Sequence, residues 1–513
     1  MSAGTDHDSY ADPVTTSAGP AAGPGWSGLE FELEVGSFAH GGHCVGRHEG
    51  RVVFVRHALP GERVVARVTE DRGGSFCRAD AVQVLTASPD RVEAPCAYAH
   101  PGGCGGCDLQ HVAPVAQPKL KATVVIEQLT RLGGLPADAI AKVFSGVEPL
   151  PGGMLGWRTR MQFAVDANGH AGLHPHRSRQ VLPIESCPIA DPRIDTLGVT
   201  TLAWPGVAAV EAVVSAGGDD AVVLDQPVER LPGRDRRGGP RRGSGPRGGR
   251  RPAAPAPSVP AELPEEVAVL VAPSPVRSAE RAAAEPLRGH RRVREEAAGR
   301  RWLVRADGFW QVHPAAANVL VDAVREALEP RPGESVLDLY AGAGLFAGVL
   351  AEAVGSEGRV VAVEADRGAC DDARRNLRDL PWVEVVTARV DRALGEAAPG
   401  AMPTVPAVPV RPARTGRGKP APVPTPAPAV DLSGPVDLIV LDPPRSGAGA
   451  AVVAQIVARR PRAVAYVACD PAAFARDVRT FGELGYELTR VRAFDAFPMT
   501  HHVECVGTLC TAR

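Results

Sequence analysis

The sequence predicts an α/β protein with a small N-terminal β-barrel, a small α+β middle segment and a C-terminal, mainly parallel doubly wound sheet. Three observations support this fold class. Short runs of alternating apolar and polar residues fill residues 28–90, a cysteine cluster follows them, and strands alternate with helices after residue 310. Such alternation is typical of a parallel sheet. The length of 513 residues allows two to four domains.

The first 27 residues are polar and rich in Ala, Gly, Pro, Ser and Thr, a composition that predicts a disordered tail. Residues 28–90 then carry strand-like runs between Gly-rich turns: Leu29–Val35, Arg51–Val55, Glu62–Val68 and Ala79–Leu85. Short strands at this spacing favour a barrel of the oligonucleotide-binding kind. Five arginines are either candidate phosphate contacts or a solvated strand face: Arg47, Arg51, Arg56, Arg63 and Arg67.

The middle segment, residues 91–306, holds four cysteines in a C-x7-C-x2-C pattern with a later Cys-Pro: Cys96, Cys104, Cys107 and Cys187. Four thiolates could bind zinc or an iron–sulfur cluster, or they could be unrelated free thiols, and the spacing alone does not choose. We expect a helix near Leu120–Leu132 and a strand at Met161–Val165. Residues 231–262 are rich in Arg, Gly and Pro, which predicts a disordered insertion.

The C-terminal segment, residues 307–513, alternates helical and strand patterns. The predicted elements are a helix at His313–Leu328, strands at Ser335–Leu339, Val360–Val363, Val436–Leu441 and Ala463–Val467, and a helix at Phe474–Leu484. Residues 398–430 are so rich in proline that they predict a second disordered insertion.

The composition limits the partners and the cellular compartment that we expect for the protein. The formal net charge is −2, so no global basic field marks a nucleic-acid partner. No apolar run is long enough to span a membrane, and the N-terminus lacks the basic start and apolar centre of a signal peptide. We therefore expect a cytoplasmic protein, in which the ten cysteines serve burial, metal binding or catalysis rather than disulfides.

A Gly-rich turn follows the first strand of the C-terminal segment. The strand ends at Asp338, and Gly342 and Gly344 open the next helix. Glycines there let backbone amides approach a ligand at the carboxyl end of a strand. About twenty residues on, Glu364 closes the next strand, where a carboxylate can hold ribose hydroxyls. The pair predicts a site for S-adenosylmethionine or a dinucleotide, whereas a Gly-rich turn alone is often an ordinary strand–helix connection.

Three polar motifs follow apolar strand-like runs further on. Asp442 opens Asp-Pro-Pro-Arg, Cys469 precedes a helix start at Asp470-Pro471, and Glu504 lies in His-His-Val-Glu-Cys. Each motif also has an ordinary interpretation. Asp442 would lie in a turn stiffened by proline, Cys469 would be a small buried apolar residue, and Glu504 would be a strand residue that faces solvent. A helix N-terminus would instead lower the pKa of Cys469.

Together, a thiol and a carboxylate suit methyl transfer to carbon 5 of uracil. That carbon is a poor nucleophile until a thiolate adds at carbon 6, and a base must afterwards remove the carbon 5 proton. The reacting base must also leave its stack to be reached.

The chain resembles the RNA uracil-C5 methyltransferase family, which makes 5-methyluridine, and in particular its 23S ribosomal RNA branch. The resemblance rests on five motifs: Phe309-Trp310-Gln311, Asp338-Leu339-Tyr340-Ala341-Gly342-Ala343-Gly344, Asp442-Pro443-Pro444-Arg445, Tyr466-Val467-Ala468-Cys469-Asp470-Pro471 and His501-His502-Val503-Glu504. It implies a Rossmann-like class I methyltransferase domain, a TRAM domain as the barrel, Cys469 as the nucleophile and Glu504 as the proton acceptor. It further implies five contacts to S-adenosylmethionine: Gln311, Tyr340, Leu345, Glu364 and Asp442.

The resemblance also implies a [4Fe–4S] cluster, in preference to zinc, on Cys96, Cys104, Cys107 and Cys187. The first gap of seven residues is longer than usual for the family. Two further departures stand in the sequence. Leu345 replaces a residue that is often polar, so only its backbone is carried over as a contact, and Asp470 replaces the usual Asn, where a negative charge raises the thiol pKa.

The expected partner is RNA, with 23S rRNA favoured over tRNA because the tRNA branch usually lacks both the barrel and the cysteines. We expect a monomer without membrane contact. Three alternatives stay open: a tRNA uracil-C5 methyltransferase, an RNA cytosine-C5 methyltransferase that also uses a cysteine, and a non-catalytic RNA-binding or ribosome-assembly protein.

Overall fold

The structure is a computed structural model that describes residues 25–225, 257, 259–272, 283–395, 432 and 434–512. Most of the predicted tail at 1–27 and most of the insertion predicted at 231–262 lie outside the described residues, as does the whole insertion predicted at 398–430. The described residues form two compact units, one of residues 25–37 and 44–88, the other of residues 38–43 and the described residues from 89 onward.

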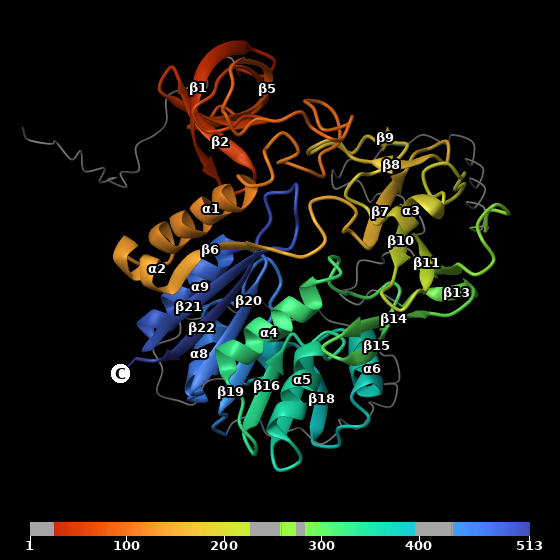
Figure 1. Cartoon of the computed structure of the whole chain (residues 1–513), viewed down its shortest axis with the longest axis vertical. Helices are drawn as coiled ribbons and strands as arrows, with labels where there is room; N and C mark the ends of the chain where they lie inside the picture. Colours follow the sequence, from red (N-terminus) through yellow and green to blue (C-terminus); the bar gives the residue numbers. More distant parts are fainter. Residues whose placement is uncertain are drawn as a thin grey trace, which may run out of the picture. The chain divides into compact units, whose positions relative to one another are not determined.

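The N-terminal unit is built around a closed five-stranded barrel with the strand order β1-β2-β3-β5-β4 (Figure 1). Its strands are β1 Glu30–Ala39, β2 His43–His48, β3 Arg51–Arg56, β4 Arg63–Asp71 and β5 Phe76–Thr86. Alternate residues of these strands, such as Leu33, Val53 and Val64, are buried inside the barrel. The predicted barrel is therefore confirmed.

At least three of the five barrel arginines form ion pairs with carboxylates on other strands of the barrel. Arg51 lies 2.7 Å from Asp71, and Arg67 lies 2.7 Å from Glu30. Arg63 forms an ion pair with Glu32. The charges of these side chains are compensated within the barrel, which weakens the prediction that they contact phosphates.

The middle of the chain forms a seven-stranded sheet and a separate two-stranded ribbon. The sheet has the order β13-β12-β11-β10-β7-β8-β9. Its strands are β7 Arg160–Val165, β8 Ala171–Leu173, β9 Leu182–Pro183, β10 Ala209–Val214, β11 Asp220–Asp225, β12 Ala268–Ala272 and β13 Glu285–Arg288, with the short helix α3 Pro192–Thr196 beside them. The ribbon pairs β14 Arg292–Ala297 with β15 Arg300–Arg305. The predicted strand at 161–165 corresponds to β7.

The C-terminal segment forms most of an eight-stranded sheet of order β18-β17-β16-β19-β20-β22-β21-β6. The strands are β16 Ser335–Leu339, β17 Arg359–Glu364, β18 Val383–Thr387, β19 Leu438–Leu441, β20 Ala463–Ala468, β21 Tyr486–Asp495 and β22 Glu504–Thr511. The first five run parallel, and β22 pairs antiparallel with β20 and β21. This arrangement confirms the predicted doubly wound, mainly parallel sheet.

The eighth strand comes from the middle of the sequence. Strand β6, Phe144–Pro149, pairs parallel with β21, although the sequence places residues 91–306 in a separate segment. Helices α1 Gln117–Arg131 and α2 Ala137–Val143 precede it, and both pack close to this sheet edge. Residues 117–149 thus extend the C-terminal sheet.

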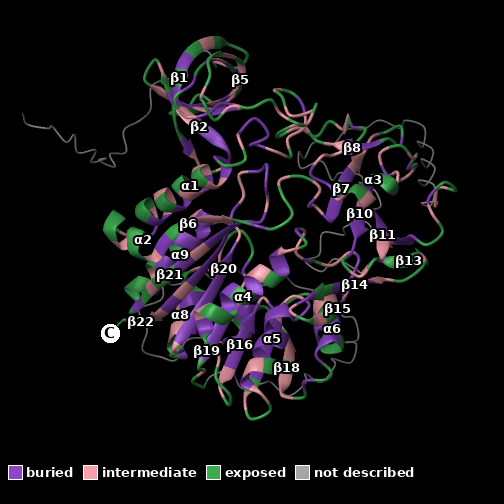
Figure 2. Ribbon diagram, viewed as in Figure 1, coloured by how far each residue is buried: buried purple, intermediate pink, exposed green. Residues whose placement is uncertain are grey.

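Helices cover both faces of the large sheet (Figure 1). On one face lie α4 Ala316–Leu328, α5 Leu345–Val354 and α6 Arg367–Asn376. The other face is covered by α1, α7 Val390–Ala393, α8 Ala450–Ala458 and α9 Pro471–Glu483. The central strands are buried on both sides (Figure 2), which explains their continuous apolar runs. None of the described helices is both long and apolar enough to cross a membrane.

The strand order marks the edge of the sheet at which a ligand is expected to bind. Strands β17 and β18 lie on one side of β16, and β19 and β20 lie on the other, so the chain direction across the sheet reverses between β16 and β19. Ligands of such sheets bind in the crevice outside the carboxyl ends of the strands at this reversal. The Gly-rich turn, Glu364, Asp442 and Cys469 all follow carboxyl ends of these strands.

Candidate active site

In the turn after β16, the last residue, Gly344, has a backbone conformation that only glycine adopts without strain. Gly344 has a φ of +89°, and a Cβ there would lie 2.8 Å from a Leu377 methyl group. Tyr340 is also left-handed, with φ +64°, and its N–H donates to the Val363 carbonyl at 2.9 Å. The turn is thus bound to the neighbouring strand at the carboxyl end of β16.

Glu364 lies beside this turn, at the end of β17. Its carboxylate accepts hydrogen bonds from the N–H groups of Gly342 at 3.0 Å, Ala365 at 2.6 Å and Asp366 at 2.7 Å. The side chain is half-buried, so one surface of the carboxylate stays accessible. These contacts hold it where the sequence predicts a ribose-binding acid.

Asp338 is a further acidic residue, on β16 just before the turn, to which the sequence analysis assigns no role. It is fully buried, and one carboxylate oxygen accepts from the Ala347 N–H at 2.7 Å. The other oxygen has no hydrogen-bond partner among the described residues. Burial, assisted by the charges of Asp442 and Glu364, raises the pKa of Asp338 to about 7. A buried polar atom of this kind marks a place for an additional hydrogen-bonding group.

Asp442 follows β19 on the opposite side of the reversal. Its N–H donates to the Leu339 carbonyl at 3.2 Å, which ties the Asp-Pro-Pro-Arg loop to the end of β16. Burial raises the pKa of the Asp442 carboxyl to about 7. The half-buried side chain is close enough to Glu504 for its charge to raise the pKa of that residue.

Strand pairing brings Cys469 and Glu504 together. Ala468 pairs with Cys505 in the antiparallel β20–β22 ladder, so the next position of each strand sets Cys469 opposite Glu504. Glu504 is only 4% exposed, and burial, together with the charge of Asp442, raises its pKa well above the usual range. The ordinary interpretation of Glu504 as a solvent-facing strand residue is therefore wrong.

The thiol of Cys469 is harder to ionise than the sequence suggests. Burial raises its pKa to about 11, with smaller contributions from the charges of Glu504 and Asp442. The expected lowering by the end of helix α9 is overcome, because these effects outweigh the helix dipole. Asp470 is the N-cap of α9 and accepts from the Ala473 N–H at 2.8 Å. Asp and Asn cap helices equally well, which explains why Asp is tolerated here.

One cation faces this acidic group. Arg445 lowers the pKa of both Cys469 and Glu504. Its guanidinium lies 3.0 Å from Nε2 of His502, and burial lowers the pKa of His502 to about 3, so the imidazole is neutral and can accept this bond. His502 thus holds the Arg445 side chain beside the acidic residues of the site.

Comparison with known proteins identifies the chain. The model of tRNA (Uracil-5-)-methyltransferases matches residues 431–512, that of TRAM domains matches residues 27–82, and that of protein-L-isoaspartate(D-aspartate) O-methyltransferases matches residues 312–403. An uncharacterized RNA methyltransferase of Streptomyces avermitilis is 45% identical over 94% of this chain and 98% of its own length. The 23S rRNA (uracil(1939)-C(5))-methyltransferase RlmD of Alkalilimnicola ehrlichii is 30% identical over 93% of this chain and 96% of its own. The chain belongs to the RNA uracil-5 methyltransferase family.

A solved relative agrees in fold. The Pyrococcus abyssi tRNA (uracil-54, C5)-methyltransferase, in complex with S-adenosyl-L-homocysteine, matches with a TM-score of 0.60 at 21% identity, over 93% of this chain and 100% of the other. At that identity the likeness shows the fold, and it supports the class I methyltransferase sheet described above.

Gln311 and Leu345 are the other two predicted cofactor contacts of the methyltransferase. Gln311 is half-buried just before α4, and its segment is anchored by Thr159, whose N–H donates to the Val312 carbonyl at 2.9 Å. Leu345 begins α5 and its side chain belongs to the apolar core. Only its backbone N–H, in the first turn where helices leave amides unpaired, could serve a ligand, in line with the backbone contact expected from the sequence.

The four predicted cluster ligands of the methyltransferase meet at one place. Cys96, Cys104, Cys107 and Cys187 line a single cavity of about 280 Å³. No three His, Cys, Asp or Glu side chains of the described segments converge closely enough to hold one metal ion.

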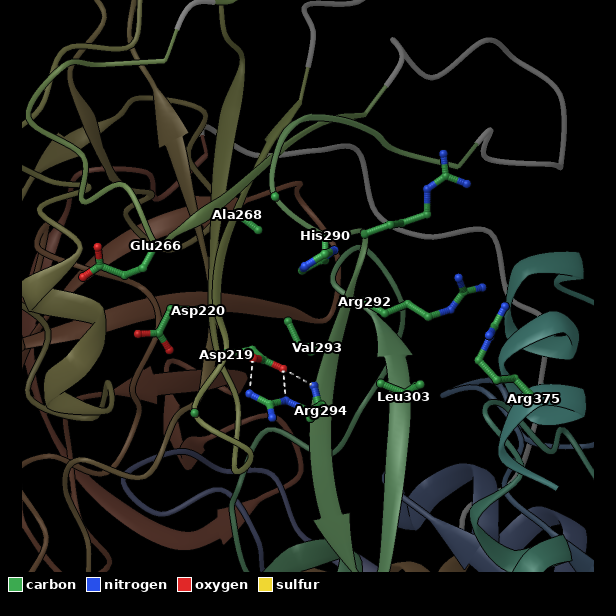
Figure 3. A pocket seen from close by; sticks show the side chains of 13 residues that line it. Asp219, Asp220, Glu266, Ala268, His290, Arg292, Val293, Arg294, Leu303 and Arg375 are labelled. Atoms are coloured by element: carbon green, nitrogen blue, oxygen red, sulfur yellow. Dashed lines mark hydrogen bonds and ion pairs between the residues drawn. The ribbon is translucent and has the colours of Figure 1, made fainter. Parts of the chain in front are cut away.

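A larger cavity, of about 730 Å³, shares none of the predicted site residues (Figure 3). Asp219, Asp220 and Glu266 lie on one side, and His290 and several arginines lie on the other. Arg294 forms a 2.7 Å ion pair with Asp219 across it. The mixed charges compensate each other, so this cavity of the methyltransferase has no clear preference for an anion.

The conformation of the turn predicts a stability difference between two glycine variants. Gly344→Ala should lower the free energy of unfolding by about 2–4 kcal/mol, because the φ of +89° costs 1–2 kcal/mol for alanine and the added methyl group displaces Leu377. Gly342→Ala is the matched control, since its φ is +54° with open space around the Cβ position, and should cost about 1 kcal/mol. Denaturant unfolding measures both, and equal losses would contradict the packing argument.

The environment of Cys469 predicts a steep pH dependence of its reactivity. Only the thiolate reacts with iodoacetamide, and a pKa of about 11 means that the thiolate fraction still rises about tenfold per pH unit from pH 7 to about pH 10. Alkylation of the Cys469 peptide, followed by mass spectrometry, measures this profile. Arg445→Ala should slow alkylation at every pH in this range, because the guanidinium lowers the thiol pKa. A plateau near pH 8 would contradict the assignment.

Proposed function

We propose that this enzyme transfers the methyl group of S-adenosylmethionine to carbon 5 of a uracil in 23S rRNA, in the cytoplasm. The observation that carries the proposal is the opposition of Cys469 and Glu504 across β20 and β22, at the strand edge that also bears the Gly-rich turn. The full-length likeness to a relative named as a 23S rRNA uracil-C5 methyltransferase supports the choice of RNA.

The residues at this edge fit S-adenosylmethionine. The turn at Gly342–Gly344 follows the carboxyl end of β16, Glu364 accepts a hydrogen bond from the Gly342 N–H of this turn, and Asp338 keeps an oxygen without a partner among the described side chains and backbone groups. We assign cofactor binding to Gln311, Tyr340, Glu364 and Asp442 and to the backbone of Leu345. When bound, the cofactor supplies an electrophilic methyl group.

Cys469 acts on the uracil ring. Its thiolate adds to carbon 6, forming a carbon–sulfur bond, and the electron pair of the 5,6 double bond moves into the ring as an enolate. Carbon 5 thereby becomes nucleophilic and accepts the methyl group. Arg445 stabilises the thiolate form, because its charge lowers the pKa of the buried thiol.

Glu504 completes the reaction. Its carboxylate removes the remaining proton from carbon 5, the electron pair re-forms the 5,6 double bond, and the carbon–sulfur bond breaks to return the Cys469 thiolate. The raised pKa of Glu504 makes it a stronger base than an exposed glutamate once it is ionised. Burial next to Asp442 is the physical source of that basicity.

The four cysteines at the 280 Å³ cavity are proposed to hold a [4Fe–4S] cluster, with zinc as the less favoured occupant. Methyl transfer needs no electron, so the cluster's contribution would be structural. Anaerobically purified enzyme should contain about four iron and four sulfide per chain, and Cys187→Ser should lose the visible absorption. Stoichiometric zinc in the absence of iron would overturn the cluster assignment and leave the methyl transfer proposal untouched.

Mass spectrometry of nucleosides from a deletion strain tests the substrate. Loss of 5-methyluridine from 23S rRNA, restored by the wild-type gene and not by Cys469→Ala, is the expected result. Loss from tRNA would keep the chemistry and overturn the substrate. With purified enzyme, 5-methylcytidine as the only product would favour the cytosine alternative, and absence of any product would favour a non-catalytic RNA-binding role.

A further inference from the structure

The loop that precedes Glu504 is held by a segment more than 370 residues away in the sequence. This catalytic loop, residues 496–503, connects the end of β21 at Asp495 to Glu504 at the start of β22. Both flanking residues are paired in the sheet, Asp495 with Pro149 of β6 and Glu504 with Phe494 of β21. The conformation between them is therefore decided by contacts made along the loop.

The main-chain contacts come from the residues directly after the third cysteine of the cluster motif. The N–H groups of Asp108 and Leu109 both donate to the Met499 carbonyl, at 3.1 and 3.0 Å. Met499 itself has a left-handed backbone with φ +66°, a conformation that is costly for a non-glycine residue and needs such support.

Two buried side chains of α1 also hold the catalytic loop. Gln117 is fully buried, accepts from the Met499 N–H at 3.0 Å and donates to the Leu109 and Val112 carbonyls at 3.1 Å. Lys121 is also fully buried, and its Nζ donates to Asp495 at 2.5 Å and to the Phe497 carbonyl at 3.0 Å. A buried ammonium that donates to both Asp495 and the Phe497 carbonyl favours one conformation at the start of the loop, because another conformation would leave the charge without partners.

The contact nearest to the chemistry is made by Asp108. Its Oδ2 lies 2.5 Å from Nδ1 of His501 and accepts from the His501 N–H at 3.3 Å. The Asp108 side chain is only 7% exposed. The next residue, His502, accepts from Arg445, and Glu504 follows two residues later. Asp108 is thus connected to both the cation and the base of the site through three consecutive loop residues.

We propose that Asp108 is a positioning residue for proton removal: by holding His501 it fixes the catalytic loop so that Glu504 faces the carbon 5 proton of the uracil bound to Cys469. The proposal rests on the function proposed above. Cys469 directly follows β20, which is held in the sheet by β19 as well as by β22, so loss of Asp108 slows proton removal more than thiolate addition. Asp108 directly follows Cys107, so the residue that binds the catalytic loop by hydrogen bonds is the chain neighbour of one of the four cavity cysteines.

The test compares Asp108→Ala and His501→Ala, the double variant, and Asp138→Ala as a control for an exposed aspartate on α2. With ordinary uracil RNA, we expect turnover to fall about 10- to 100-fold in both single variants, the effect of small displacements of a catalytic group. A covalent enzyme–RNA adduct should accumulate on denaturing gels, and deuterium at carbon 5 should slow product formation more than in wild type. The double variant should be no slower than Asp108→Ala, because both changes remove one contact.

His501→Ala keeps the proposal testable even where Asp108→Ala does not fold, since the His501 side chain is partly exposed. Reduced turnover without adduct and without a larger isotope effect would overturn the positioning role, as would additive losses in the double variant. 5-Fluorouracil RNA separates the two proposals, because fluorine cannot leave carbon 5 as a proton. If wild type forms no adduct with that RNA, the proposed chemistry fails; if it does and the variants match wild type on ordinary RNA, only the inference fails.

Discussion

Replacement of Cys469 by alanine is expected to abolish methyl transfer, with a loss on the order of 10⁶-fold in turnover, the size of effect seen when a covalent nucleophile is deleted. Without the thiolate, carbon 5 of uracil stays unactivated. The measurement is incorporation of labelled methyl groups from S-adenosylmethionine into a 23S rRNA transcript, together with adduct formation on 5-fluorouracil RNA.

The control for this variant is Cys510→Ala, a partly buried cysteine further along β22. It should retain activity, which separates the loss of one particular thiol from a general effect of removing sulfur from this sheet. Binding of S-adenosylhomocysteine by Cys469→Ala should stay near wild type, because the Gly-rich turn lies after β16. Substantial turnover by the Cys469→Ala variant would contradict the covalent mechanism, whatever the affinity of the variant for RNA.

Glu504→Gln is expected to slow turnover by about 10²- to 10⁴-fold, the usual contribution of a general base, while leaving thiolate addition and methyl transfer possible. Glutamine keeps the size of the side chain but accepts no proton, so the methylated adduct should persist on Cys469. Gel analysis and mass spectrometry of the adduct during turnover on ordinary uracil RNA provide the measurement. Glu487→Gln, an exposed residue of β21, is the control. Normal product release by Glu504→Gln would assign proton removal to another group.

The same variant tests the burial of the carboxyl. The pKa of Glu504 is raised in the folded protein, so its favourable contribution to stability is present below the unfolded-state pKa of about 4.3 and is lost as the pH rises through the folded-state pKa. Glutamine resembles the protonated form at every pH. Glu504→Gln should therefore raise the thermal midpoint relative to wild type at about pH 8, and the difference should shrink toward about pH 4.

The sequence predicts those parts of the candidate site that consist of residues close together in the chain. The Gly-rich turn after an apolar strand, the acid that closes the next strand, and the thiol before Asp-Pro each carry their meaning within a few residues. The strands of the barrel and of the parallel sheet were predictable for the same reason, since the period of apolar residues is a local property. Resemblance to a known family then assigned roles to Cys469 and Glu504.

The tertiary structure decided whatever depends on residues far apart in the chain. Only the β20–β22 pairing shows Cys469 opposite Glu504, and only the packing around them shows that burial outweighs the helix end and raises the thiol pKa. Asp108 and Asp338 carry no sequence signal for their contacts, and β6 completes the C-terminal sheet from a distant segment. The sequence by itself thus determined the local elements and the kind of chemistry. Burial, strand register and hydrogen bonds across hundreds of residues depend on the folded chain as a whole, so only the tertiary structure decided how the site is arranged.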